Sequence, residues 1–95
     1  MTLRLTLKKK WFDMILSGEK KEEYRELKPY WFIRFAGREF SHVHFTNGYG
    51  KDKPQILIEC KGVSISQFGV HKWGFQEKCY VIRLGKIVET WNITK

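Results

Sequence analysis

The chain has few cysteines, few prolines and no long apolar run. Its 95 residues include two Cys and two Pro. Cys60 and Cys79 lie far apart and form no metal-spaced pair, so we expect free, buried thiols in a reducing compartment. No apolar run approaches the ~20 residues that cross a bilayer, and the N-terminus alternates at once, unlike a secretory signal. We therefore expect one soluble, cytoplasmic domain spanning residues 1–95, without a cofactor.

Acidic residues are also scarce relative to basic ones. Ten Asp and Glu face eighteen Lys and Arg, which leaves a net charge of +8 and a pI near 9.7. Residues 1–50 carry ten basic and six acidic groups, and residues 51–95 carry eight and four, so each half contributes +4. An excess spread in this way indicates a folded basic surface that attracts polyanions. RNA or a nucleotide is the first candidate partner. The alternative partners are an acidic protein and an anionic membrane surface. A charged surface that only keeps the protein soluble is the remaining alternative.

The hydrophobic pattern predicts an α+β domain. Alternation and helical spacing predict strands at 2–8, 20–26, 42–46, 56–65, 80–84 and 86–91, and helices at 9–17 and from Pro29 to Gly37. Gly85 is expected to separate the last two strands, and the stretch 47–54 is expected to be an exposed loop. Five or six strands with two short helices favour a partly closed β-barrel with the helices packed on it, because closure removes exposed edges.

The segment from Gly18 to Arg25 contains the most informative spacing. Alternation places Glu23 and Arg25 on the same face of a strand, so that a carboxylate lies beside a guanidinium. The guanidinium fork can then grip a phosphate or stack on a base. Lys20 converges on the same point only if the chain bends near Gly18. The alternative is a surface ladder of ion pairs that contributes little to stability.

The same segment resembles the signature of the ASCH domain family, a branch of the PUA-like barrels. Gly18, Lys20, Glu23 and Arg25 match the pattern Gly-x-Lys-x-x-Glu-x-Arg, and the flanking elements extend the resemblance over nearly the whole chain. The resemblance implies a PUA-like barrel that recognises RNA or a modified nucleotide in a cleft.

Some small members of that family are amidohydrolases acting on an acylated cytidine, and others are single-strand ribonucleases. In the amidohydrolase pattern a Lys activates a Thr three residues later, whereas here Glu23 follows Lys20 at that distance. Nucleotide binding is therefore the primary expectation. The alternative is a hydrolase that uses Lys20 and Glu23 as catalytic residues.

Two further segments offer contacts to a nucleic acid. Lys8, Lys9 and Lys10 stand at the start of the first predicted helix, where anions bind well, and we expect them to steer a polyanion. Asn47 and Tyr49 lie in the predicted exposed loop. Tyr49 can stack on a base, and Asn47 can form hydrogen bonds with a base edge.

The remaining candidate residues are more ambiguous. Trp31 and Trp73 could also stack on bases, but packing in the core is the commoner role of such rings. His42 and His44 share one strand face, and His71 lies elsewhere. The sequence offers no third and fourth ligand at normal spacing, so no metal site is expected.

Overall fold

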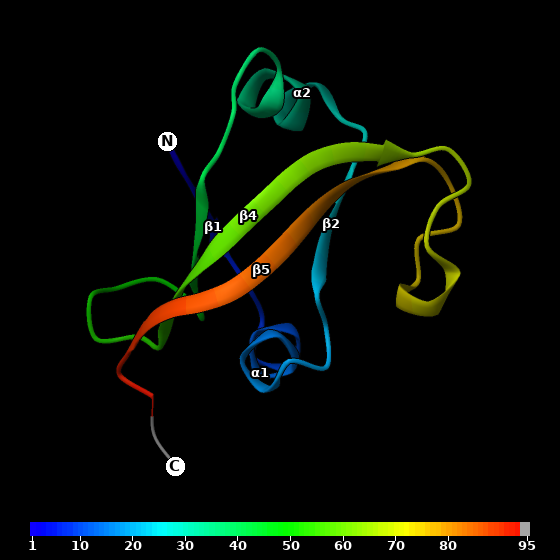
Figure 1. Ribbon diagram of the computed structural model, residues 1–95. Coiled ribbons are helices and arrows are strands. Elements are labelled where there is room, and N and C mark those ends of the chain that lie inside the picture. Colours follow the sequence, from blue (N-terminus) through cyan, green and yellow to red (C-terminus); the bar gives the residue numbers. More distant parts are fainter. Residues whose placement is uncertain (94–95) are drawn as a thin grey trace.

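Five strands of one mixed sheet curve into a half-barrel in the computed structural model, which describes residues 1–93 (Figure 1). The order across the sheet is β1-β3-β4-β5-β2, in which β1 pairs with β3 in parallel and all other pairs are antiparallel. The strands are β1 (Thr2–Thr6), β2 (Glu22–Glu26), β3 (His42–Thr46), β4 (Gln55–Ser66) and β5 (Cys79–Trp91). The predicted α+β, partly closed barrel is confirmed.

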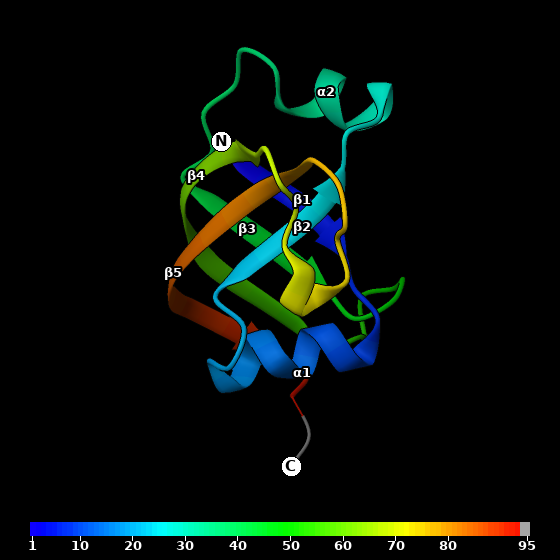
Figure 2. The same cartoon turned by 90° about the vertical axis from the view of Figure 1, so that its right-hand side faces the viewer.

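Two helices lie at opposite ends of the half-barrel (Figures 1 and 2). Helix α1 (Lys9–Ser17) follows β1, and helix α2 (Pro29–Phe35) follows β2. Pro29 stands in the first turn of α2, where its missing N–H removes no helical hydrogen bond. The connection between β4 and β5 carries a short 3₁₀ helix, η1 (His71–Trp73), as Figure 2 shows.

The core forms on the concave face of the sheet, as the alternation predicts. Because successive strand residues point to opposite faces, every second side chain of β1 and β3 is buried. The members with at most 5% exposure from β1, β3, β4 and α1 are Leu3, Leu5, Val43, Phe45, Ile56, Ile58, Phe12 and Ile15. Helix α1 therefore covers one end of the core with its apolar face.

The predicted break between two C-terminal strands is wrong, because β5 runs unbroken past Gly85. The pairing of β4 with β5 shifts register around Ile58 and Cys60. At this irregularity Glu59 Oε1 accepts a hydrogen bond from the N–H of Lys86 at 2.9 Å. A Cβ on Gly85 would stand 2.7 Å from the same oxygen. Gly85 thus gives the Glu59 side chain room inside a continuous ladder.

Further expectations from the sequence concern the two cysteines, a membrane span and a metal site. Cys79 is buried as expected, but Cys60 is only half-buried. Within residues 1–93 no helix has the length and apolar character needed to cross a membrane. The described part of the chain also holds no cluster of three or more His, Cys, Asp or Glu side chains suited to a metal ion.

Two glycines with positive φ make a matched test of the loop that contains η1. Gly69 (φ +75°) lies in this loop, and a Cβ there would collide with the carbonyl oxygens of Phe75 and Glu77. Gly37 (φ +68°) has no atom within 4 Å of a built Cβ. We expect Gly37→Ala to cost about 1–2 kcal/mol of unfolding free energy, the cost of a left-handed residue. Gly69→Ala should cost clearly more in urea denaturation, and equal losses would contradict the collision.

Candidate functional site

The chain bends after α1, as it must if Lys20 is to meet Glu23 and Arg25. Gly18 ends the helix in the left-handed conformation with φ at 85°, which glycine adopts without a steric cost. The N–H of Lys20 then donates to the carbonyl of Met14 at 3.0 Å. Strand β2 begins only at Glu22, two residues later than predicted. Lys20 therefore lies outside the strand, and the alternation of strand side chains does not place it on the face opposite Glu23.

Lys20, Glu23 and Arg25 form one network of charges. Lys20 Nζ donates to Glu23 Oε1 at 2.7 Å, and Arg25 Nη2 donates to Glu23 Oε2 at 2.7 Å. The side chains of Lys20 and Glu23 are only 4% and 7% exposed, and that of Arg25 is 19% exposed. The expectation that the three groups meet is confirmed. A surface ladder of ion pairs is excluded, because the network is largely withdrawn from water.

Aromatic rings surround the Lys20 ammonium. Its Nζ lies 4.6 Å from the ring centroid of Trp11, 5.2 Å from that of Tyr24 and 5.6 Å from that of Trp73. Trp11 and Trp73 also meet edge to face, with centroids 5.9 Å apart. Each ring attracts the cation through its negative π face. The rings thus hold in place an ammonium that Glu23 partly neutralises.

Arg25 connects the two edge strands of the half-barrel. Its Nη2 donates to the backbone carbonyl of Thr6 at the end of β1, at 3.3 Å. Its guanidinium carbon lies 5.0 Å from the ring centroid of Trp31 in α2. Among residues 1–93 the buried Nε of Arg25 has no hydrogen-bond partner. The side chain is therefore fixed by an acid, a carbonyl and a ring from three different elements.

These residues line a hollow of about 710 Å³, which we call the aromatic cleft. A volume of about 300–1,000 Å³ is typical of small-molecule sites. Its polar members include Lys8, Lys20, Glu23, Arg25 and Asn47. Its rings are Trp11, Tyr24, Trp31, Tyr49, Trp73 and Phe75. All five predicted ligand-binding residues, Lys20, Glu23, Arg25, Asn47 and Tyr49, therefore line one hollow.

The predicted steering residues divide into two groups. Lys8 lines the aromatic cleft, whereas Lys9 and Lys10 do not. Lys9 forms an exposed ion pair with Asp13 at 2.6 Å, and the ammonium of Lys10 lies 4.8 Å from the ring centroid of Trp11. Lys8 is thus the member of this cluster that is placed to contact a ligand in the cleft.

Sequence reasoning missed part of the wall. Neither Trp11 nor Phe75 is among the residues that the sequence predicts to bind a ligand. In the structure both rings line the aromatic cleft. The sequence does carry a signal for Trp11, since this ring directly follows three lysines. The bridge between Val70 and Phe75 that shapes the other wall has no such signal.

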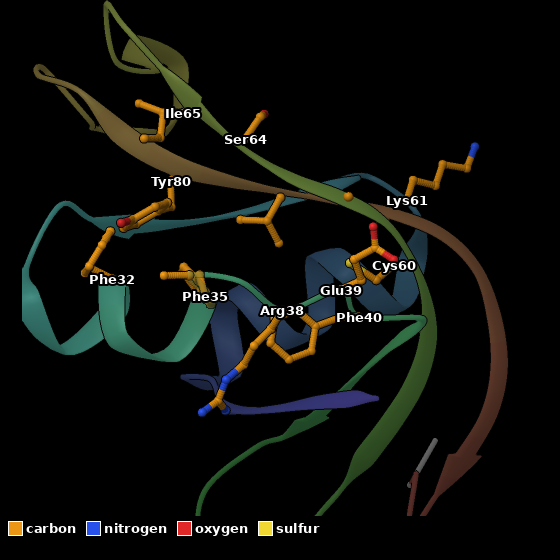
Figure 3. Close-up of a pocket in the computed structure, with 13 residues that line it drawn as sticks. Phe32, Phe35, Arg38, Glu39, Phe40, Cys60, Lys61, Ser64, Ile65 and Tyr80 are labelled. Atoms are coloured by element: carbon orange, nitrogen blue, oxygen red, sulfur yellow. The ribbon is translucent and has the colours of Figure 1, made fainter.

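A second hollow of about 690 Å³ lies between α2 and β4 and contains none of the predicted ligand-binding residues (Figure 3). Its wall includes the side chains of Phe32, Phe35, Phe40 and Tyr80. No buried ion pair of the described residues reaches it. The aromatic cleft, which joins buried charges to rings, is therefore the stronger candidate site.

The charges of the cleft suit an anion with a flat ring. Its three cations, Lys8, Lys20 and Arg25, and its two acids, Glu23 and Glu26, leave one net positive charge. Both oxygens of Glu23 accept short hydrogen bonds from cations. The carboxylate is thereby engaged in orienting Lys20 and Arg25.

Comparisons of the chain with protein-family models, with curated proteins and with solved structures give no match. The resemblance to the ASCH family thus remains a prediction from the sequence.

Removing the acid of the buried network should be costly. Glu23→Ala leaves the Lys20 ammonium buried without its carboxylate, and we expect a loss of about 3–5 kcal/mol in unfolding free energy. The matched control is Asp13→Ala, which removes the acid of an exposed ion pair of similar length and should cost about 0.5 kcal/mol or less. Urea denaturation measures both changes, and similar losses in the two variants would contradict the burial of the network.

Tyr24 should make the protein sensitive to alkali. Its burial, its hydrogen bond to Glu22 and the negative charges of Glu22 and Glu23 raise the pKa of the phenol. Above about pH 10 the unfolded chain loses this proton while the folded chain keeps it, so the unfolding free energy falls as pH rises. Tyr24→Phe should decline less steeply in urea titrations on either side of that pH. Equal slopes would contradict the assignment.

Proposed function

We propose that this protein binds RNA or a nucleotide in the aromatic cleft. The observation that carries the proposal is the buried Lys20–Glu23–Arg25 network lining a hollow that is walled by aromatic rings. Rings stack on bases of any sequence, and cations bind the phosphates beside them. A net charge of +8 concentrates polyanions around such a site. The resemblance to ASCH domains implies the same class of ligand.

Each residue of the cleft receives a role from its position. Tyr49 is 84% exposed, so its ring can close over a base that enters the cleft. Asn47 lines the cleft two residues earlier, and its side-chain amide offers two donors and an acceptor for a base edge. Arg25 and Lys8 contact phosphate, whereas Lys9 and Lys10 act at longer range. Lys20 is enclosed by rings and anchors Glu23.

The cleft supports a hydrolase less well. Hydrolysis needs a base or nucleophile that can reach the substrate, and both oxygens of Glu23 already accept hydrogen bonds from cations. The geometry instead supports a positioning role for Glu23, the orientation of Arg25. A hydrolytic activity of Lys20 and Glu23 would show itself as cleavage of single-stranded RNA or as deacylation of an acylated cytidine.

The exposed ring of Tyr49 allows binding to be tested without disturbing the fold. Tyr49→Ala should weaken the binding of a labelled single-stranded RNA about 5- to 150-fold, because one base loses a stacking partner worth about 1–3 kcal/mol. The matched control is Phe68→Ala. Phe68 is 85% exposed but does not line the aromatic cleft, so its loss should leave the Kd unchanged. Fluorescence anisotropy at fixed salt measures both variants.

Three outcomes would contradict the proposal. These are an unchanged Kd in Tyr49→Ala, an equal loss in Phe68→Ala, and binding that does not weaken with salt, since phosphate contacts release counterions. The same samples can be analysed for cleavage of the strand and for deacylation of an acylated cytidine. Product formation that disappears in Lys20→Ala and in Glu23→Gln would assign a hydrolase to the cleft instead.

A further inference from the structure

A small hollow of about 360 Å³ lies behind the wall of the aromatic cleft. The two hollows share the side chains of Tyr24 and Trp73. Four cationic residues line the smaller hollow, which we call the cationic hollow: Lys21, Lys61, Lys72 and Arg83. They come from four segments that are distant in sequence, so the fold itself gathers them.

The architecture directs these side chains to one place. Arg83 in β5 pairs with Gly62 in β4, and a Cβ at Gly62 would stand 3.2 Å from Arg83 Nη2. The missing side chain thus lets the guanidinium lie across β4. Lys61 lines both the cationic hollow and the hollow between α2 and β4, and its side chain extends away from the rings of the latter (Figure 3). Lys72 Nζ lies 5.1 Å from the ring centroid of Trp73, which places this ammonium on the shared wall.

The cationic hollow carries uncompensated charge. Glu19 and Glu22 are the acidic residues that line it, so its four cations leave a net +2. Within the described chain none of the four cations lies within 4.0 Å of a carboxylate oxygen. Glu22 instead accepts a hydrogen bond from the hydroxyl of Tyr24 at 2.7 Å. Like charges brought together repel one another, and a bound anion relieves that repulsion.

A neighbouring hollow shows that this charge is particular to one side of the cleft. This third hollow shares Glu26 and Phe75 with the aromatic cleft, but its Lys28 and Lys78 are balanced by Glu26 and Glu77. Lys28 also forms an ion pair with Glu26 at 3.3 Å. A strand that extends beyond the aromatic cleft therefore finds a net positive charge for its phosphate in the cationic hollow, beside Trp73. The third hollow, beside Phe75, offers no such charge.

We propose that the cationic hollow binds a phosphate of the same single-stranded RNA whose base occupies the aromatic cleft. The ligand is then a strand that passes over Trp73, and not a free nucleotide. This inference rests on the proposed function and deepens it. The two hollows meet at the Tyr24 and Trp73 side chains, so neighbouring nucleotides of one strand can occupy both.

The test compares a short single-stranded RNA of mixed sequence with the four nucleoside monophosphates. Lys72→Gln combined with Arg83→Gln removes two phosphate contacts. The slope of log Kd against log salt for the RNA should then fall by about 0.7, since the one phosphate that both side chains contact contributes about 0.7 for a single strand. The Kd of whichever monophosphate binds should stay unchanged. Calorimetry over a salt series measures both.

The matched control is Lys78→Gln combined with Lys86→Gln, which removes the same charge from exposed positions outside both hollows. A smaller slope in the Lys72 and Arg83 variant alone supports the proposal. Equal slope changes in the two double variants overturn it, because net charge alone then explains the loss. A monophosphate that binds as tightly as the RNA also overturns it while leaving the proposed function intact. If neither ligand binds the wild-type protein, the proposed function fails and this inference fails with it.

Discussion

The buried carboxylate of Glu23 is the group on which the candidate site depends. It accepts one hydrogen bond from Lys20 and one from Arg25, both at 2.7 Å. A buried pair of charges is tolerated only when its geometry is good and its partners are satisfied. Here the ammonium is further enclosed by rings, and the guanidinium is held by a carbonyl of β1. Helix α1, strand β2 and the loop with η1 are thereby fixed relative to one another.

Much of the fold could be predicted because the pattern is local. Alternation identified β1 and β3 with their buried residues, and Pro29 marked the start of α2. The break expected at Gly85 was wrong for a nonlocal reason. The glycine accommodates the Glu59 side chain of a neighbouring strand, and a propensity for turns contains no information about that partner.

The candidate site was predictable in its residues but not in its walls. The spacing of Glu23 and Arg25 fixed their common face, and Gly18 offered the bend that Lys20 needs. Helical periodicity cannot tell a buried ring such as Phe12 from a ring that lines a cleft, such as Trp11. The cationic hollow unites four segments through the pairing of β4 with β5. Such an arrangement becomes visible only when the strand register is known.

The enclosure of Lys20 also determines which ligands the aromatic cleft rejects. Clusters of Trp and Tyr rings bind quaternary ammonium groups, such as choline and methylated lysine, by presenting their π faces to the cation. In this protein the faces of Trp11, Tyr24 and Trp73 already contact the chain's own ammonium. An incoming cation would have to displace Lys20 from its carboxylate and would meet the charge of Arg25. The protein's own ammonium thus takes the place at these three rings that a methylammonium ligand would need.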